Sequence, residues 1–196
     1  IEKIIEECPN VEKVVVLSSK ADMPSTKFSE VISYEELLSM GSENFQWVDG
    51  EETDACGICY TSGTTGNPKG VVYTHRSNTL HALTQAAPDM LNLSSTDTVM
   101  PVVPLFHANG WSIAYTAPLV GSSIVFPGGD LSPSSLYDML ERGVTMTAAV
   151  PTVWLLLLNF LESEQKKLSS LERVVIGGSS CPVSYTHLTL PTIPQV

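Results

Sequence analysis

The segment YTSGTTGNPKG, residues 60–70, has the composition of a loop that wraps anionic groups. Its glycines allow positive φ angles, which bring backbone N–H groups close to an anion; they are Gly63, Gly66 and Gly70. Lys69 adds a positive charge, and short hydroxyl side chains add donors: Thr61, Ser62, Thr64 and Thr65. An ordinary surface turn is the alternative, but a turn needs fewer hydroxyl groups and no lysine. We therefore predict a phosphate-binding loop.

A Walker-type loop, G-x-x-x-x-G-K-[ST], is the nearest competing pattern. It fails at two positions, because Pro68 replaces the second Gly and Gly70 replaces the Ser or Thr. The flanking sequences ACGICY and VVYTH both predict strands, whereas a Walker loop opens a helix. We expect a loop that joins two strands and closes over a nucleotide.

The same segment resembles the diagnostic motif of the adenylate-forming acyl-CoA synthetases, the AMP-dependent synthetases and ligases. The likeness extends from about Tyr34 to Pro182, and PVVPLFHANGW, residues 101–111, is similar to the medium-chain fatty-acyl and general acyl-activating branch. The resemblance implies ATP-dependent activation of a carboxylic acid, namely a fatty acid, to an acyl-adenylate and then to an acyl-CoA thioester. ATP, Mg²⁺ and CoA are the implied cofactor and cosubstrates, and the acid, ATP and CoA are the implied small-molecule partners.

The resemblance also implies roles for individual residues. Lys69 and His107 would be catalytic, with His107 beside the reacting carboxylate. Asn109, Gly110 and Trp111 would line the acyl pocket together with His107. A loop between the adenine site and this pocket would contain Gly177, Gly178 and Ser179. On the residues alone, His107 also fits an ordinary residue at a strand end, and the glycine pair fits a plain turn.

Net charge is −11, from 10 Lys and Arg against 21 Asp and Glu, so no overall field attracts nucleic acid or an anionic membrane. The longest strongly apolar run, residues 153–158, is far shorter than the roughly 20 residues of a spanning helix. We expect no transmembrane segment and a soluble, intracellular protein of the cytoplasm or the peroxisome.

Four cysteines favour a reducing compartment over a disulfide framework. Cys56 and Cys59 form C-x-x-C, but their spacing on a strand turns the side chains to opposite faces, and no second Cys or His pair is nearby. His75 and His81 are six residues apart on a predicted helix, a spacing that also separates their faces. We therefore assign no metal ligand.

The alternation of strands and helices predicts the α/β class: a doubly wound, mostly parallel sheet with flanking helices. The resemblance implies that this sheet is part of a larger adenylation domain. Prolines place residues 98–103 in a short or edge strand. Further strands are predicted at 11–19, 122–126, 144–150 and 172–176, and helices at 1–8, 33–40, 74–87, 132–142 and 151–165.

We expect a fragment, with residues 1–182 forming part of an AMP-binding domain. The last residues, VSYTHLTLPTIPQV at 183–196, contain no charged side chain, and we interpret them as a frame-shifted or adapter-derived tail. The family's magnesium-binding Glu, its ribose-binding Asp, its hinge and its lid Lys would lie beyond this point.

Two alternatives stay open. The chain as given is a catalytically inactive remnant that binds only nucleotide or a partner. A weaker alternative is a module that passes its acyl group to a carrier-protein thiol instead of CoA.

Overall fold

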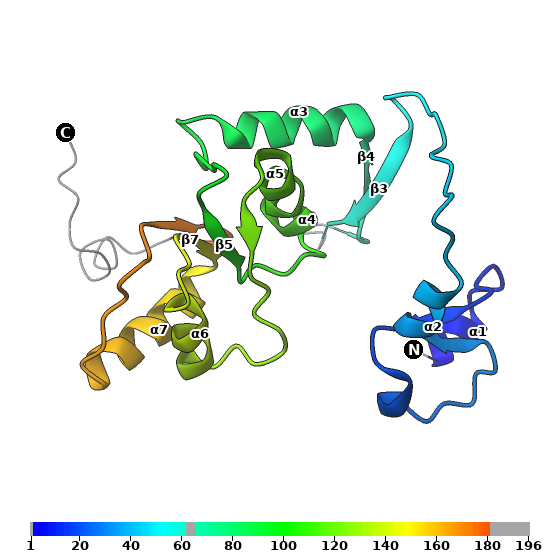
Figure 1. Ribbon diagram of the computed structural model, residues 1–196, viewed down its shortest axis with the longest axis horizontal. Helices are drawn as coiled ribbons and strands as arrows, with labels where there is room; N and C mark the ends of the chain where they lie inside the picture. The colour runs from blue at the N-terminus through cyan, green and yellow to red at the C-terminus, as the bar shows by residue number, and fades with distance from the viewer. Residues whose placement is uncertain (1, 62–65, 181–196) are drawn as a thin grey trace. The chain divides into compact units, whose positions relative to one another are not determined.

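The computed structural model describes residues 2–61 and 66–180 (Figure 1). The chain divides into two compact units, with the boundary between Asp49 and Gly50. The first unit contains a short parallel pair of strands, and the second contains a hairpin and a larger parallel sheet.

In the first unit the elements are α1 (Glu2–Glu6), β1 (Val14–Val16), the 3₁₀ turn η1 (Lys20–Asp22), β2 (Val31–Ser33) and α2 (Tyr34–Ser39). The predicted strand over 11–19 is confirmed only at its centre. The strand is half-buried instead of buried, because β2 pairs with it along one edge.

The predicted start of α2 is confirmed in detail. The Ser33 hydroxyl accepts from the Glu36 N–H at 3.2 Å, and the Glu36 carboxylate accepts from the Ser33 N–H at 3.0 Å. Hydrogen bonds from Ser33 and an ion pair with Lys20 lower the pKa of Glu36 to about 2. This capping box satisfies donors that the first helical turn leaves open.

The second unit opens with an antiparallel hairpin. Its strands are β3 (Ala55–Tyr60) and β4 (Gly70–Thr74), with Tyr60 opposite Gly70 and a register shift between Ala55 and Gly57. Helix α3 (His75–Ala86) follows β4 directly, and the Thr74 hydroxyl caps it by accepting from the Ser77 N–H at 3.1 Å. The prediction that two strands flank the loop is therefore confirmed.

The larger sheet is wholly parallel in the order β6-β5-β7-β8. Its strands are β5 (Thr98–Pro101), β6 (Ser123–Ile124), β7 (Met146–Ala149) and β8 (Arg173–Ile176). The connections carry α4 (Ala108–Trp111) and α5 (Ile113–Val120), then α6 (Pro133–Leu140), then α7 (Pro151–Ser163). In Figure 1 the helices α6 and α7 lie on one side of the sheet, and α4, α5 and α3 lie on the other. The predicted doubly wound α/β class is confirmed.

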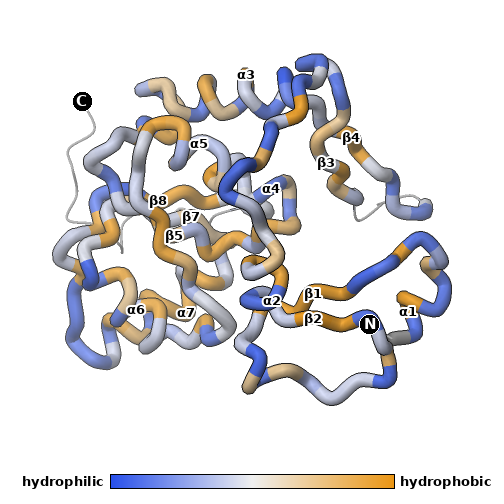
Figure 2. The backbone as a smooth tube through the Cα atoms, turned by 45° about the vertical axis from the view of Figure 1, so that its right-hand side comes forward, coloured by the Kyte–Doolittle hydropathy of each residue, from blue (hydrophilic) through white to orange (hydrophobic). Residues whose placement is uncertain are grey.

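Two buried clusters cover the two faces of this sheet. One contains Met100 and Ala149 with residues of α6 and α7: Leu136, Leu140, Trp154 and Leu157. The other contains Val99, Met146 and Ala148 with residues of α5: Ile113 and Ala117. Side chains that alternate along a strand point to opposite faces, so each strand supplies both clusters. Figure 2 accordingly colours β5, β7 and β8 largely hydrophobic.

The prediction of a short or edge strand over residues 98–103 is confirmed as a short strand, which is not at an edge of the sheet. β5 lies inside the sheet, between β6 and β7. A proline is tolerated there because β6 pairs only with Thr98 and Val99, so Pro101 lies beyond the end of that ladder. On the other side Pro101 is opposite Ala148 of β7.

A polar cluster ties the amino ends of these strands together. The Asp97 carboxylate accepts from the Ser94 N–H at 2.8 Å, from the Thr145 hydroxyl at 2.7 Å and from the Arg173 guanidinium. Burial raises the pKa of Asp97, but the hydrogen bonds from Arg173, Thr145 and Ser94 outweigh it and hold the pKa below its usual value.

None of the helices that the structure describes has the length and apolarity needed to cross a membrane.

Candidate active site

The end of the hairpin brings the two described flanks of the predicted phosphate loop together. The Thr61 N–H donates to the Lys69 carbonyl at 2.9 Å, and the Lys69 N–H donates to the Thr61 hydroxyl at 3.3 Å. Both residues are exposed, and within residues 2–61 and 66–180 the Lys69 ammonium forms no ion pair. Ser62, Gly63, Thr64 and Thr65 lie outside the described residues. A free cation at the mouth of this turn is available to an anionic ligand.

One of the predicted loop glycines has a role other than a positive φ. Gly70 has no φ in the left-handed range, so that prediction is wrong for this residue. A Cβ added to Gly70 would lie 3.1 Å from Ile58 and 3.4 Å from the Tyr60 ring. Gly70 is therefore needed because the opposite strand approaches it closely, while Gly66 is exposed with open space around it.

The predicted acyl-pocket motif forms a left-handed turn. Five consecutive residues have φ between 45° and 65°, namely Ala108, Asn109, Gly110, Trp111 and Ser112. Each non-glycine residue in this conformation costs about 1–2 kcal/mol relative to a right-handed one. His107 precedes the turn with φ −91° and is exposed, and its backbone carbonyl accepts from the Gly110 N–H at 3.0 Å. Four strained residues at one place mark a segment held by its surroundings.

Contacts from three sides hold this turn. The Cys59 thiol of β3 donates to the Asn109 amide oxygen at 3.5 Å. Gly110 is buried so tightly that an added Cβ would lie 2.8 Å from the Leu105 side chain. The buried Ser112 carbonyl accepts from the Thr116 hydroxyl at 2.9 Å. Cys59 thus connects the acyl-pocket motif to the strand that leads into the phosphate loop.

The third predicted segment lies against the second. A Cβ added to Gly177 would lie 3.0 Å from the Trp111 ring, so the indole covers this glycine directly. Gly178 has φ +87°, and an added Cβ would lie 3.1 Å from Val150. Ser179 is exposed. Both glycines follow β8, at the carboxyl end of a parallel strand, where open α/β sheets bind ligands.

A cavity of about 270 Å³ adjoins the turn, and several of its lining residues were missed from the sequence. It is lined by Asn109, Trp111 and Ser112 and also by Tyr73, Asn78, His81, Gln85 and Tyr115. A signal existed, because Asn78, His81 and Gln85 follow a spacing of three and four residues that puts them on one face of α3. His81 was considered only as half of a metal pair with His75.

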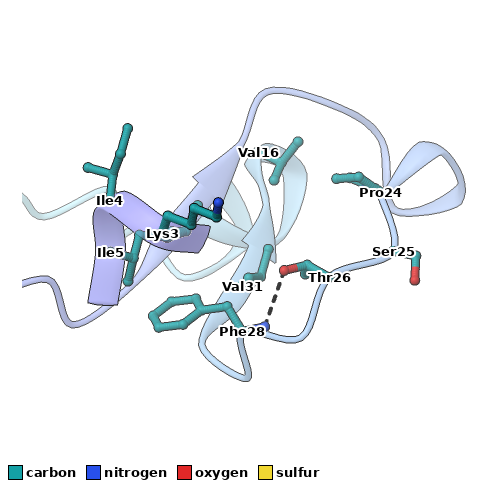
Figure 3. Close-up of a pocket in the computed structure, with 10 residues that line it drawn as sticks. Lys3, Ile4, Ile5, Val16, Pro24, Ser25, Thr26, Phe28 and Val31 are labelled. Atoms are coloured by element: carbon teal, nitrogen blue, oxygen red, sulfur yellow. Dashed lines mark hydrogen bonds between the residues drawn. The ribbon is translucent and has the colours of Figure 1, made fainter. Parts of the chain in front are cut away.

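Other cavities lie elsewhere in the described residues. One of about 490 Å³ shares Asn78 and Tyr115 with the first cavity and also contacts Cys56, His75 and Leu119. Another, of about 730 Å³, lies within the first unit against α1, β1 and β2 (Figure 3). Its labelled side chains are mostly apolar, including Ile4, Val16 and Phe28, and it contains none of the predicted site residues.

The cysteines of the C-x-x-C motif have separate partners. Cys56 accepts from the Asn78 amide at 3.1 Å, whereas Cys59 contacts Asn109. Among the residues that the structure describes, no group of three or more His, Cys, Asp or Glu side chains is arranged to hold a metal ion. Both thiols act here as hydrogen-bonding strand residues.

Comparison with known proteins identifies the family of the chain. The family described as AMP-binding enzyme matches residues 1–192. A medium-chain-fatty-acid–CoA ligase of Ectopseudomonas oleovorans is 46% identical over 177 residues, which cover 90% of this chain and 32% of that protein. A long-chain-fatty-acid–CoA ligase of Thermus thermophilus is 45% identical over 185 residues, or 94% of this chain and 32% of that protein.

Among solved structures, a long-chain-fatty-acid-CoA ligase from Archaeoglobus fulgidus superposes with a TM-score of 0.70 at 30% identity, over 79% of this chain and 32% of the other. The chain belongs to the AMP-binding enzyme family. It spans about a third of the length of the relatives it matches.

Proposed function

We propose that the full-length protein containing these residues activates a carboxylic acid in two steps. A carboxylate oxygen attacks the α-phosphate of MgATP, which forms an acyl-adenylate and releases pyrophosphate. The thiolate of CoA then attacks the acyl carbon, which forms the thioester and releases AMP. The names of the relatives, medium-chain and long-chain fatty-acid–CoA ligases, support a fatty acid as the substrate class.

The observation that carries the proposal is the convergence of three segments. Strand β3 leads into the hairpin end that carries Lys69, and Cys59 of this strand contacts Asn109. Trp111, two residues after Asn109, covers Gly177. Contacts thus link the strand before the predicted phosphate loop, the predicted acyl-pocket motif and the glycine pair after a parallel strand. Adenylation needs these parts together, because the acid and the phosphates must meet in one orientation.

In this proposal the residues have separate tasks. Backbone and hydroxyl donors of residues 61–66 hold the β- and γ-phosphates, and Lys69 neutralises charge as pyrophosphate leaves. His107 orients the carboxylate and the adenylate phosphate, while Asn109, Gly110 and Trp111 form the wall of the acyl pocket. Gly177, Gly178 and Ser179 separate that pocket from the adenine. Each charge-assisted contact to phosphate contributes about 1.5–3 kcal/mol.

The test is ATP–pyrophosphate exchange in the full-length protein. We expect Lys69→Ala and His107→Ala each to reduce exchange by about tenfold or more, because each removes a contact to developing charge. Lys167→Ala is the matched control, since Lys167 is an exposed lysine outside the proposed site. Unchanged exchange in both site variants would overturn the assignment.

The proposed alternatives are tested by the same protein. A thioester assay with CoA and a carrier protein side by side distinguishes the two acceptors. Absence of exchange in the 196-residue chain, with exchange in the full-length protein, supports the view that this chain alone is a catalytically inactive remnant. Exchange by the 196-residue chain itself contradicts it.

We also propose that residues 1–182 form part of the adenylation domain and that residues 183–196 are foreign to it. The support is the absence of Asp, Glu, Lys and Arg after Pro182. The family match extends to residue 192, so the boundary needs a direct measurement. Sequencing the native transcript through the codons for Cys181 and Pro182 provides it. A continuation into a charged helix supports the proposal, and a native stop after Val196 contradicts it.

A further inference from the structure

The cavity beside the left-handed turn has a polar lining on the α3 side. Asn78, His81 and Gln85 contribute amide and imidazole groups, and Tyr73 and Tyr115 contribute aromatic rings with hydroxyls. At about 270 Å³ the cavity lies just below the range of about 300–1,000 Å³ that small-molecule sites occupy. A cavity built for alkyl chains alone would present apolar side chains at these helix positions.

Two of these side chains form a pair. The Gln85 amide nitrogen lies 3.1 Å from the His81 ring nitrogen Nε2, one turn away on the same helix. Each partner keeps hydrogen-bonding capacity after this contact, because imidazole has a second nitrogen and the amide has an oxygen. Gln85 is half-buried and His81 is exposed, so the pair is supported by the helix and remains accessible to a ligand.

The pair and the predicted acyl wall belong to the same cavity. Asn109 and Trp111 line it opposite residues of α3, and Trp111 also covers Gly177. An acid whose carboxylate lies near His107 would therefore extend its other end toward α3. An alkyl end would remove water from His81 and Gln85 without replacing the lost hydrogen bonds, which is unfavourable.

We propose that His81 and Gln85 select acids that carry a hydrogen-bonding group at the end remote from the carboxylate, such as a hydroxyl, over alkanoic acids of the same size. The inference rests on the proposed function and specifies its substrate class. The polar end donates to or accepts from the pair, and the tyrosine and tryptophan rings pack against the intervening methylenes.

The experiment measures kcat/KM for ATP–pyrophosphate exchange by the full-length protein with 6-hydroxyhexanoate and with heptanoate, which have equal numbers of non-hydrogen atoms. We expect the wild-type protein to prefer the hydroxy acid. Gln85→Met and His81→Leu should each lower the ratio of hydroxy acid to alkanoic acid by about five- to tenfold, the order expected for one lost hydrogen bond. The ratio is measured within one preparation, so partial misfolding cancels.

Thr84→Val is the control, because Thr84 is exposed on α3 and lies outside the cavity lining, and its hydroxyl donates to the Leu80 carbonyl of its own helix. Its ratio should equal that of the wild type. A wild-type preference for heptanoate, or an unchanged ratio in both site variants, overturns this inference and leaves the proposed function standing. Absence of exchange with every acid overturns both.

Discussion

The β3–β4 hairpin and the parallel sheet β6-β5-β7-β8 belong to one unit but differ in how they are held. In the sheet, Val99, Met100 and Met146 are fully buried. On one face of the hairpin, Ile58 is 58% exposed and Val72, directly opposite, is 55% exposed. The sheet is stabilised from both faces, whereas the hairpin depends mainly on its own ladder.

This difference indicates that the sheet supports the structure, whereas the hairpin end is suited to ligand binding. Segments with few buried contacts open locally at low cost, and binding loops are drawn from them. The hairpin carries Thr61 and Lys69, while the sheet supplies the carboxyl ends after which the strained turn and the glycine pair follow. We therefore expect substitutions in the sheet to change stability, and substitutions at the hairpin end to change activity.

The largest effect is expected from Met146→Ala in β7. Removing this fully buried side chain from the cluster around Ile113 and Ala148 should lower the free energy of unfolding by about 2–5 kcal/mol. Val72→Ala in the hairpin should cost less than about 1 kcal/mol, because the side chain is already exposed. Urea titration measures both values. Equal costs would erase the distinction between the two regions.

The second effect compares two ion pairs. Asp97→Asn should lower the free energy of unfolding by about 2–3 kcal/mol. This loss is smaller than that expected from breaking a fully buried ion pair, because the Arg173 side chain is 28% exposed. Glu52→Gln breaks the pair with Arg76 beside the hairpin, where both side chains are more than half exposed, and should produce no measurable change. A larger loss in Glu52→Gln would contradict the comparison.

The pH dependence follows from the same carboxylate. The folded pKa of Asp97 lies below its unfolded value of about 3.9, so its contribution is complete above that pH. It is lost as the pH falls through the folded pKa. Urea titrations between neutral pH and pH about 2.5 should therefore show a steeper acid loss in the wild type than in Asp97→Asn. Parallel curves would show that this carboxylate is not coupled to folding.

A third effect concerns the contact that joins the site to the sheet. Gly177→Ala adds a Cβ 3.0 Å from the Trp111 ring and should displace the indole from the proposed acyl pocket. We expect kcat/KM for the acid in the full-length protein to fall by about tenfold, since small displacements of positioning groups reduce rates strongly. Gly129→Ala is the control, because nothing lies within 4 Å of its added Cβ. A fall of equal size in the control would refute the Trp111 explanation.

The smallest effect is expected at the hairpin end. Thr61→Val removes the hydroxyl that accepts from the Lys69 N–H but keeps the Thr61 N–H bond to the Lys69 carbonyl. Stability should change by less than about 1 kcal/mol, while ATP–pyrophosphate exchange falls a few-fold. Thr61→Ser retains the hydroxyl and should restore exchange. Failure of Ser to restore it would argue that the Thr61 hydroxyl has no part in phosphate binding.

Local features were the predictable ones. Helix starts at Ser33, Thr74, Ser132 and Pro151 and strands on both sides of residues 61–69 were expected from the sequence, and the structure has them, the first three as N-cap residues. Each depends on hydrogen bonds or backbone restrictions within about four residues, so the sequence alone specifies it. The alternation of strands and helices likewise predicted the parallel, doubly wound class.

Other features depend on residues far apart in the chain. The inner position of β5 follows from where β6 ends, and the need for Gly70 follows from Tyr60 on the opposite strand. The left-handed turn at residues 108–112 persists because Cys59 and Leu105 hold it, although its own residues favour a right-handed turn. His81 and Gln85 line the cavity beside the left-handed turn only once α3 packs beside α5.

The sequence by itself determined the family motif, the hairpin around residues 61–69 and the fold class, because these arise from local conformational preferences and hydrophobic periodicity. Tertiary structure alone decided which surfaces meet: Trp111 on Gly177, and α3 on the turn after His107. Such contacts depend on the packing of segments that are dozens of residues apart, and no local pattern encodes that packing.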